Sequence, residues 1–524
     1  MKKHFNYITL AVGLLLMAGC SKDLDLQPTN DITGDVAYTD PEGYKSGIAK
    51  VYGSFSTTGN QGSGSGDLGG IDAGTSDFLR LFWMAQELPT DEAICSWITD
   101  DGIPGLNNMT WSSTNIMLLG VYARSIYQIT VANEFLREST SEKLSNRGIT
   151  GNDATEIAYY AAEARFLRAF QYWVLMDLFA NPPFVTETSV VGKDAPPQIS
   201  RADLFDYVES ELLAIEPLLK SDNEYGRATS LTASALLARL YLNAEVYTGT
   251  ARYNEAASYA EKVIQSGKYS LHTEYANLFM ADNNLNNPEV IFSINYDGVN
   301  TQNFGGTTYL INAATGGTLS PVDFGVPQGG WQGNRSRPTL PNVFGNHATT
   351  NDQRSMFAGS KNSIDNIATF TDGLAVAKFT NKTSTGETAP SVGGTFCSTD
   401  FPLFRLAEMY LIYAEASLRG GQGNNATALG YINLLRERAY GNSTGNLSSI
   451  TLDGILNERM RELYWEGFRR SDLVRYDRFV GSSYLWPWKG GTANGQAVDS
   501  FRNIYPLPST DVIANPNLTQ NTGY

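Results

Sequence analysis

The 524-residue sequence predicts a mainly α-helical protein, an interrupted solenoid of paired helices that carries large loop-rich insertions. Three observations support this fold class: a long helix with two apolar faces, later helical segments that pair at similar offsets, and intervening stretches rich in Gly, Asn and Thr. We expect a helical core at about 115–271 and 401–476, with ligand-binding insertions at about 56–112 and 272–400.

The longest predicted helix occupies residues 154–183. It ends at the two prolines that follow Asn181, because proline lacks the backbone N–H and disfavours a helical residue before it. Small residues such as Ala158 and Ala162 recur along one face, and large ones such as Phe166 along another. A helix with two packing faces needs a neighbour on each, so we expect layered helices, as in a solenoid.

Later segments repeat this pattern in pairs. The spacing of apolar residues predicts further helices over 115–138, 201–220, 231–247, 253–266, 408–419 and 426–440. In three of the predicted helix pairs, the first helix carries a short similar pattern at a similar place. The three patterns are Ala162-Glu163-Ala164, Ala244-Glu245-Val246 and Ala414-Glu415-Ala416. In the last two units an alanine follows twelve residues later, which is the offset of two short helices folded back on each other. The pairing resembles tetratricopeptide units.

The N-terminus carries an export signal. Two lysines precede the apolar run 7–18, which predicts a secretory signal peptide over 1–19. The sequence LMAGC that ends at Cys20 resembles a bacterial lipobox, in which the cysteine is diacylated. We therefore expect lipid attachment at Cys20, a tether over 20–35 and a single domain over 36–524, with an ordinary signal peptide as the alternative.

Composition excludes several classes of protein. Lys plus Arg number 38 against 54 for Asp plus Glu, giving a net charge of −16, so there is no basic field to bind nucleic acid. Cys95 and Cys397 are the cysteines that remain after Cys20, which allows at most one disulfide bond. Whether these two residues pair is left open by the sequence.

The sequence contains no recognisable catalytic or metal-binding motif. His272 and His347 lie far apart without metal-ligand spacing, and neither a Gly-x-Ser-x-Gly elbow nor a phosphate-binding Gly-rich loop occurs. We predict no catalytic residue, no metal site and no cofactor. Because a glycosidase needs only two carboxylates, a glycoside hydrolase remains the competing class.

The strongest carboxylate candidates lie at 458–470. Glu458, Glu462 and Glu466 follow one another at intervals of four among several arginines, and Glu466 and Arg470 fit an i,i+4 ion pair. Neighbouring arginines keep carboxylates ionised rather than raising the pKa of one to act as an acid. We therefore interpret this segment as a structural charge network.

Binding is better supported than catalysis, because aromatic rings in loops can stack on the apolar faces of sugar rings. For each ring the alternative is packing in the core, where tryptophan is usually largely buried. The polar residues Asp100, Asn107, Gln328 and Arg335 lie near the candidate rings. The predicted ligand-binding residues are the rings Trp97, Trp331, Tyr296 and Trp83, with Asp101 and Asn334 as partners for hydroxyl groups.

Several segments follow one another in a specific order along nearly the whole chain. After the lipobox come ELPTDEA at 87–93, EARFLRA at 163–169, RPT at 337–339, DQR at 352–354, RLAEMYL at 405–411, NERMREL at 457–463, EGFRRSDL at 466–473, PLP at 506–508 and NPNLTQN at 515–521. Together they resemble the SusD/RagB family of nutrient-binding outer-membrane lipoproteins of Bacteroidetes. The chain departs from the family at Arg470-Ser471-Asp472, where an aromatic residue followed by Asp is commoner.

The resemblance implies a SusD-like helical fold with four tetratricopeptide-like units and a loop-rich half that binds glycans. It also implies a partner, a SusC-like TonB-dependent β-barrel transporter, and a lipid-anchored location on the outer membrane facing the cell exterior. No motif transfers ligand-binding residues, because those of the family lie in variable loops. We predict a non-enzymatic protein that captures an oligosaccharide or polysaccharide for the transporter, with capture of peptides or another nutrient, and a structural surface-layer role, as alternatives.

Overall fold

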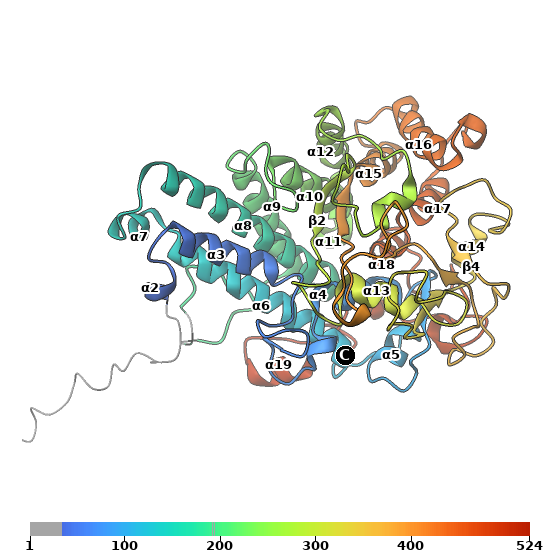
Figure 1. Cartoon of the computed structure of the whole chain (residues 1–524), viewed down its shortest axis with the longest axis horizontal. Coiled ribbons are helices and arrows are strands. Elements are labelled where there is room, and N and C mark those ends of the chain that lie inside the picture. The colour runs from blue at the N-terminus through green and yellow to red at the C-terminus, as the bar shows by residue number, and fades with distance from the viewer. Residues whose placement is uncertain (1–33, 191, 193) are drawn as a thin grey trace, which may run out of the picture.

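The computed structural model describes residues 34–190, 192 and 194–524, so the predicted signal peptide and Cys20 lie outside the described residues. A helical part and a loop-rich part lie side by side: α3, α6 and α8 extend together on one side, while α13, α14 and β4 lie among loops on the other (Figure 1). The helices of the first part are α2 (Gly34–Ala37), α3 (Pro41–Gly53), α6 (Ile116–Glu138), α7 (Ser141–Asn146), α8 (Gly151–Phe179), α9 (Arg201–Ile215), α10 (Ser230–Leu242), α11 (Ala244–Thr248), α12 (Tyr253–Gln265), α15 (Leu406–Leu418), α16 (Asn425–Tyr440), α17 (Leu452–Leu463) and α18 (Arg469–Arg475).

The predicted long helix is α8, and its second half, residues 166–179, is buried on every side, whereas Ala158 near its start is exposed. In this half the small residue Ala169 and the large residues Phe166 and Phe170 are inaccessible to solvent. α6 and α9 pack against α8 on either side of it. This confirms the prediction that the helix lies within a layer rather than on a surface.

The helices pair as the sequence predicts. α10 packs on α12 and α15 packs on α16, and α12 also packs on α15 although the loop-rich segment separates the two in sequence. One predicted helix, 231–247, is divided into α10 and α11 at Asn243. The side chain of Asn243 donates to the main-chain oxygen of Arg239 at 2.9 Å and accepts from Arg475 at 2.8 Å, which fixes the break.

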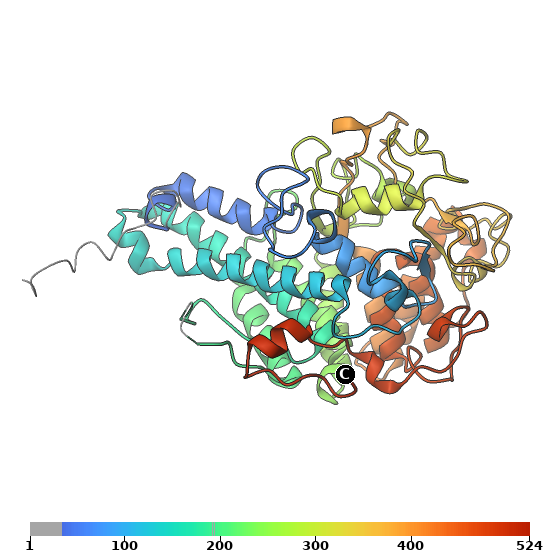
Figure 2. The same cartoon turned by 90° about the horizontal axis from the view of Figure 1, so that it is seen from below.

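The loop-rich part holds more regular structure than its composition indicates. The segment 56–112 contains the fully buried helix α4, and the predicted strand at 289–296 is β2, which pairs antiparallel with β6 at the start of α15. Figure 2 shows the blue segment after α3 beside the yellow-green loops around α13. The elements of this part and of the C-terminus are α4 (Phe78–Glu87), β1 (Ala93–Cys95), α5 (Ile103–Asn107), β2 (Val290–Ile294), α13 (Gly306–Ala314), β3 (Asn334–Ser336), α14 (Thr339–Asn342), β4 (Phe357–Ala358), β5 (Ala375–Val376), β6 (Phe401–Arg405) and α19 (Ser509–Ala514).

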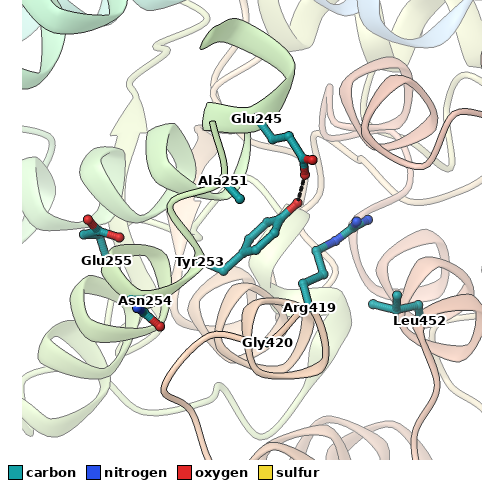
Figure 3. A pocket seen from close by; sticks show the side chains of 8 residues that line it. All are labelled: Glu245, Ala251, Tyr253, Asn254, Glu255, Arg419, Gly420 and Leu452. Carbon is teal, nitrogen blue, oxygen red and sulfur yellow. Dashed lines mark hydrogen bonds between the residues drawn. The ribbon is translucent and has the colours of Figure 1, made fainter. Parts of the chain in front are cut away.

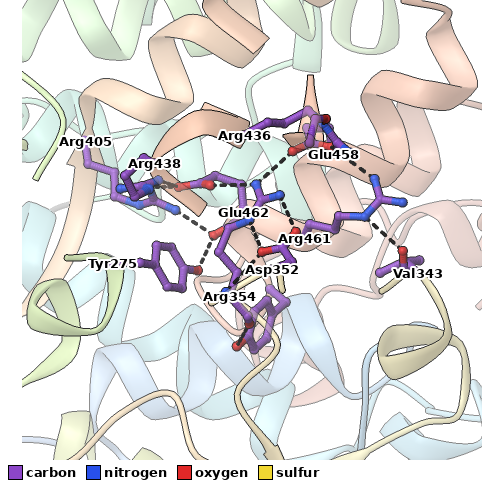
Figure 4. Close-up of polar contacts among 12 residues, drawn as sticks. Tyr275, Val343, Asp352, Arg354, Arg405, Arg436, Arg438, Glu458, Arg461 and Glu462 are labelled. Atoms are coloured by element: carbon purple, nitrogen blue, oxygen red, sulfur yellow. Dashed lines mark hydrogen bonds and ion pairs between the residues drawn. The ribbon is translucent and has the colours of Figure 1, made fainter. Parts of the chain in front are cut away.

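A cluster of buried charged side chains joins the two parts (Figure 4). Glu462 of α17 accepts from Arg354 of the loop-rich part at 3.0 Å and from Arg405 of β6 at 2.6 Å. Arg354 also pairs with Asp352 at 2.7 Å and with Glu458 at 2.8 Å. All five side chains are at most 2% exposed, so each charge depends on its partners rather than on water.

The arginines keep the carboxylates of this network ionised. Burial raises the pKa of Glu462, but Arg438, Arg405 and Arg354 outweigh burial and hold the pKa below its usual range. Burial likewise opposes the ionisation of Glu458, whose pKa is nevertheless lowered, with Arg354 as the largest opposing cause. The arrangement agrees with the predicted structural charge network.

The predicted ion pair between Glu466 and Arg470 is wrong. Glu466 lies beyond the end of α17, in a turn where Trp465 has a φ of 67°. Since the chain has left the helix there, Glu466 does not reach Arg470 at helical spacing and pairs instead with Arg405 at 2.7 Å. Arg470 pairs with Asp177 of α8 at 3.1 Å.

We expect Glu462→Gln to destabilise the protein by about 3–5 kcal/mol, because it leaves buried arginines with too little negative charge. Unfolding by heat or urea at neutral pH measures the change. The control is Glu134→Gln, whose side chain is 51% exposed and pairs with Arg137 one turn away. This variant should change stability by less than about 0.5 kcal/mol. Equal stability of the two variants would contradict the role assigned to the network.

The network also predicts a dependence on pH. The pKa values of Glu458 and Glu462 are lowered in the folded state, so their stabilisation is complete above the pKa of the unfolded chain, about 4.3, and is lost as the pH falls toward the folded pKa. We expect the wild-type protein to lose stability below about pH 5. Glu462→Gln should lose less over the same interval.

Candidate functional site

Two of the predicted rings, Trp97 and Trp331, are brought together by the antiparallel pair of β1 and β3. The pairing continues past the strands, because the N–H of Ser96 donates to the main-chain oxygen of Gly333 at 2.8 Å. The indole Nε1 of Trp97 then donates to the main-chain oxygen of Trp331 at 3.1 Å. A Cβ on Gly333 would lie 2.6 Å from the Trp97 ring, so only glycine lets the ring cross the chain there.

Trp97, Phe304 and Trp331 form a partly exposed cluster, which we call the aromatic platform. Phe304 is 37% exposed, and its ring centroid lies 6.3 Å from that of Trp331. The buried guanidinium of Arg80 lies 5.9 Å from the Trp97 ring centroid and 4.7 Å from that of buried Tyr309, and it donates to the main-chain oxygen of Phe304 at 3.3 Å. Arg80 therefore holds two members of the platform from the protein side.

Three predicted ligand-binding residues are core residues instead. Trp83 is completely buried on α4, where its ring stacks on Trp465 with centroids 5.5 Å apart. Asn334 is 1% exposed and donates to the hydroxyl of Tyr309 at 2.8 Å. Tyr296 is 7% exposed, so its ring face is not available to a ligand. Of the polar residues expected nearby, Asn107 and Arg335 are buried as well.

The remaining predicted residue, Asp101, is exposed in the loop that carries Trp97. The sequence analysis missed Phe304 and Arg80. Phe304 lies in a Gly-rich segment where nothing in the local pattern distinguishes it. Arg80 belongs to a helix that begins with Asp77, whose side chain accepts from the N–H of Arg80 at 2.8 Å, and this N-cap before an apolar run was a usable signal.

A recess of about 520 Å³ lies on the helical part, between the α11–α12 turn and the end of α15 (Figure 3). Several of its polar side chains already have partners within the protein, although one Nη of Arg419 is buried without a hydrogen bond. The hydroxyl of Tyr253 donates to Glu245 at 2.5 Å, and Arg419 donates to Glu415 at 2.8 Å while covering the Tyr253 ring at 5.6 Å. The aromatic platform, whose rings are open to solvent, is the better candidate for ligand recognition.

The described residues contain neither a cluster of metal ligands nor a helix that could span a membrane. No group of three or more His, Cys, Asp and Glu residues in 34–190, 192 and 194–524 is placed to hold a metal ion. No helix in that part of the chain is both long enough and apolar enough to cross a membrane.

The fold and the platform define a ligand-binding protein built on a helical-repeat scaffold. The SusD family model matches residues 331–524. The sequence is 37% identical to the starch-binding protein SusD of Bacteroides thetaiotaomicron, over 100% of this chain and 99% of that protein. The chain belongs to the SusD family.

Solved structures support the same fold. A SusD homolog from Bacteroides thetaiotaomicron matches with a TM-score of 0.73 at 20% identity, over 94% of this chain and 99% of that chain. Surface glycan-binding protein A from Bacteroides uniformis matches with a TM-score of 0.70 at 21% identity, over 92% and 99% of the two chains. The predicted SusD-like α-helical fold is thereby confirmed.

The two cysteines beyond the N-terminal segment are free thiols. Cys95 is on β1 and Cys397 precedes β6, and both are buried. Burial raises the pKa of Cys95 to about 12, and it also raises the pKa of Cys397 above its usual range. The thiolate, which is the reactive form, is therefore scarce at both positions at neutral pH.

With Cys20 changed to Ser, we expect neither Cys95 nor Cys397 to react with a thiol-specific reagent in the native protein, because both are buried and protonated. Both should react in denaturant without added reductant, and absorbance of the released chromophore counts them. Rapid labelling of the native protein would contradict their burial. No labelling in denaturant would indicate a disulfide bond.

Proposed function

We propose that this protein is a non-enzymatic lipoprotein of the outer membrane that captures an oligosaccharide or polysaccharide and passes it to a SusC-like TonB-dependent transporter. The aromatic platform is the observation that carries this proposal. Its rings are partly exposed in loops, where they can cover the apolar face of a sugar ring. The 37% identity to a relative named as starch-binding supports a glycan as the ligand.

The arrangement of the platform and of the buried carboxylates favours ligand binding without catalysis. Stacking on Trp97 and Trp331 desolvates the apolar face of a sugar, and exposed polar side chains of the same loops, such as Asp101 and Gln332, can bond its hydroxyl groups. The carboxylates of the buried network are paired with arginines, which removes them as an acid–base couple. The proposal therefore assigns recognition to the platform and stability to the network.

Delivery requires that the protein stay near the transporter. A diacylated Cys20, followed by a polar tether, would hold the folded domain at the membrane surface without spanning it. The net charge of −16 agrees with a neutral or cationic ligand and with the absence of nucleic-acid binding.

We expect Trp97→Ala and Trp331→Ala each to weaken polysaccharide binding at least about tenfold, because each removes a stacking face. Native gels containing starch or one of a panel of other polysaccharides measure the retardation. The control is Tyr431→Ala, which removes a partly buried ring on α16 that stacks on Tyr410. This variant should bind like the wild type.

The same gels, together with assays of reducing ends, peptide binding and self-assembly, decide between the alternatives. Release of new reducing ends at catalytic rates would make the protein a glycoside hydrolase. Retention of peptides but of no polysaccharide would identify another nutrient as the ligand. Self-assembly without saccharide affinity would indicate a surface-layer role, and undiminished binding by both tryptophan variants would place the site elsewhere.

We expect Cys20→Ala to move the protein from the membrane fraction to the soluble fraction, because the lipid anchor is lost. The matched control is Cys397→Ala, which changes a buried thiol and should leave the protein in the membrane fraction. Immunoblots of fractionated cells measure the distribution, and protease treatment of intact cells tests the outward orientation. Membrane retention of the Cys20 variant would contradict anchoring through this residue.

A further inference from the structure

A second cavity, of about 300 Å³, lies apart from the platform rings at the C-terminal end of α3. Its walls come from α3, α8, β2 and the loop 220–229 that joins α9 to α10. Most of the lining is apolar or aromatic, with a small number of polar side chains. The apolar and aromatic members are Ala49, Tyr52, Phe55, Leu167, Tyr225, Phe292 and Ile294.

The cavity is held open by one buried carboxylate. Glu163 of α8 is 1% exposed and accepts from the hydroxyl of Tyr52 at 2.6 Å. It also accepts from Arg227 through Nη2 at 2.6 Å and from Asn223 at 3.2 Å. Because these partners come from α3 and from the loop 220–229, Glu163 fixes the loop against the helices. The cavity is thus preformed rather than produced by a loose loop.

The chemistry of the lining matches that of a sugar ring. Tyr225, which is 40% exposed, and the buried residue Phe55 both line the cavity. Polar groups at the cavity come from Ser293, Thr301 and exposed Asn295, whose side chain accepts from Ser293 at 2.6 Å. An apolar surface with few polar groups is typical of a site that takes the apolar face of a sugar and bonds its hydroxyl groups.

The cavity is directly connected to the aromatic platform through the chain. The side-chain amide of Asn303 donates to the main-chain oxygen of Ser56, a lining residue, at 2.5 Å. The next residue is Phe304, a member of the platform, and Thr301 of the same segment lines the cavity. In Figure 2 the segment that follows α3, drawn in blue, lies beside the yellow-green loops near α13. The platform and the cavity therefore share one wall segment, 301–304.

We propose that this cavity is a second subsite, which receives a further sugar unit or a side branch of the same glycan that stacks on the platform. The inference rests on the proposed function. In this arrangement the platform supplies the primary contact, and the cavity adds affinity only for ligands that extend beyond it. The cavity then contributes to selection by chain length and branching.

The first variant is Gly53→Leu, which adds a side chain at a residue that lines the cavity and ends α3. A Cβ on Gly53 would meet nothing within 4 Å, so the added side chain begins in open space. The control is Gly430→Leu on α16, an exposed position where a Cβ likewise meets nothing within 4 Å. A second variant, Tyr225→Ala, removes the exposed ring instead of filling the space.

Binding is measured by calorimetry with maltotriose and maltoheptaose, and with the corresponding fragments of any other polysaccharide that the gels retain. We expect Gly53→Leu and Tyr225→Ala to weaken heptasaccharide binding by about tenfold and to leave trisaccharide binding unchanged. Gly430→Leu should bind both ligands like the wild type. Heptasaccharide affinity that is unchanged in both cavity variants would overturn the subsite.

The outcomes separate the subsite from the proposed function. If Trp97→Ala abolishes binding while neither Gly53→Leu nor Tyr225→Ala has an effect on any ligand length, the subsite is wrong and the platform stands. If neither tryptophan variant changes binding but Gly53→Leu weakens both ligands equally, the cavity is the primary site and the two-site arrangement is wrong. If the wild-type protein binds no saccharide, both proposals fail.

Discussion

The pairing of buried arginines with buried carboxylates is the constraint on which the rest of this structure depends. Arg354, Arg405 and Glu462 come from the loop-rich part, a strand and a helix, and none can leave the others without exposing an uncompensated charge to the core. Packing between apolar surfaces tolerates small shifts, whereas a network of charged hydrogen bonds requires one arrangement. The loop-rich part is therefore fixed to the helical scaffold despite its irregular chain.

Arg337, which follows β3, fixes the strand pair that carries Trp97 of the aromatic platform. Its buried guanidinium donates to the main-chain oxygens of Ala93 at 2.9 Å and Asn107 at 2.7 Å, and so holds β1 and α5 against β3. Burial lowers the pKa of Arg337 to about 9, because no carboxylate contacts the charge closely enough to offset its loss of water. The protein thus buries the charge of Arg337 despite the loss of its hydration. This indicates that the hydrogen bonds of Arg337 are important for the strand pair that supports Trp97.

The sequence predicted what depends on local patterns and failed where distant residues decide. α8, α12 and α16 begin and end close to the predicted positions, because apolar spacing, proline and caps act within a few residues. The break at Asn243 and the ion pairs of Glu466 were not predicted, since both depend on residues elsewhere in the chain. α4 was missed although Arg80 and Glu87 lie on one face of it, and these polar residues are buried by contacts with distant segments, such as that of Glu87 with the N–H of Gly467.

The same limit applies to the platform. Trp83 lies in an apolar run and is buried against Trp465, whereas Trp97 lies in a turn-rich loop, crosses the chain at Gly333 and stays partly open. Exposure is thus decided by long-range packing that one sequence does not reveal. The packing also immobilises the exposed ring. Because the Trp97 ring is held by a main-chain hydrogen bond, it would lose little conformational freedom if a ligand stacked on it. Affinity then depends on how many such rings a ligand can reach, and selectivity on the exposed polar side chains around them.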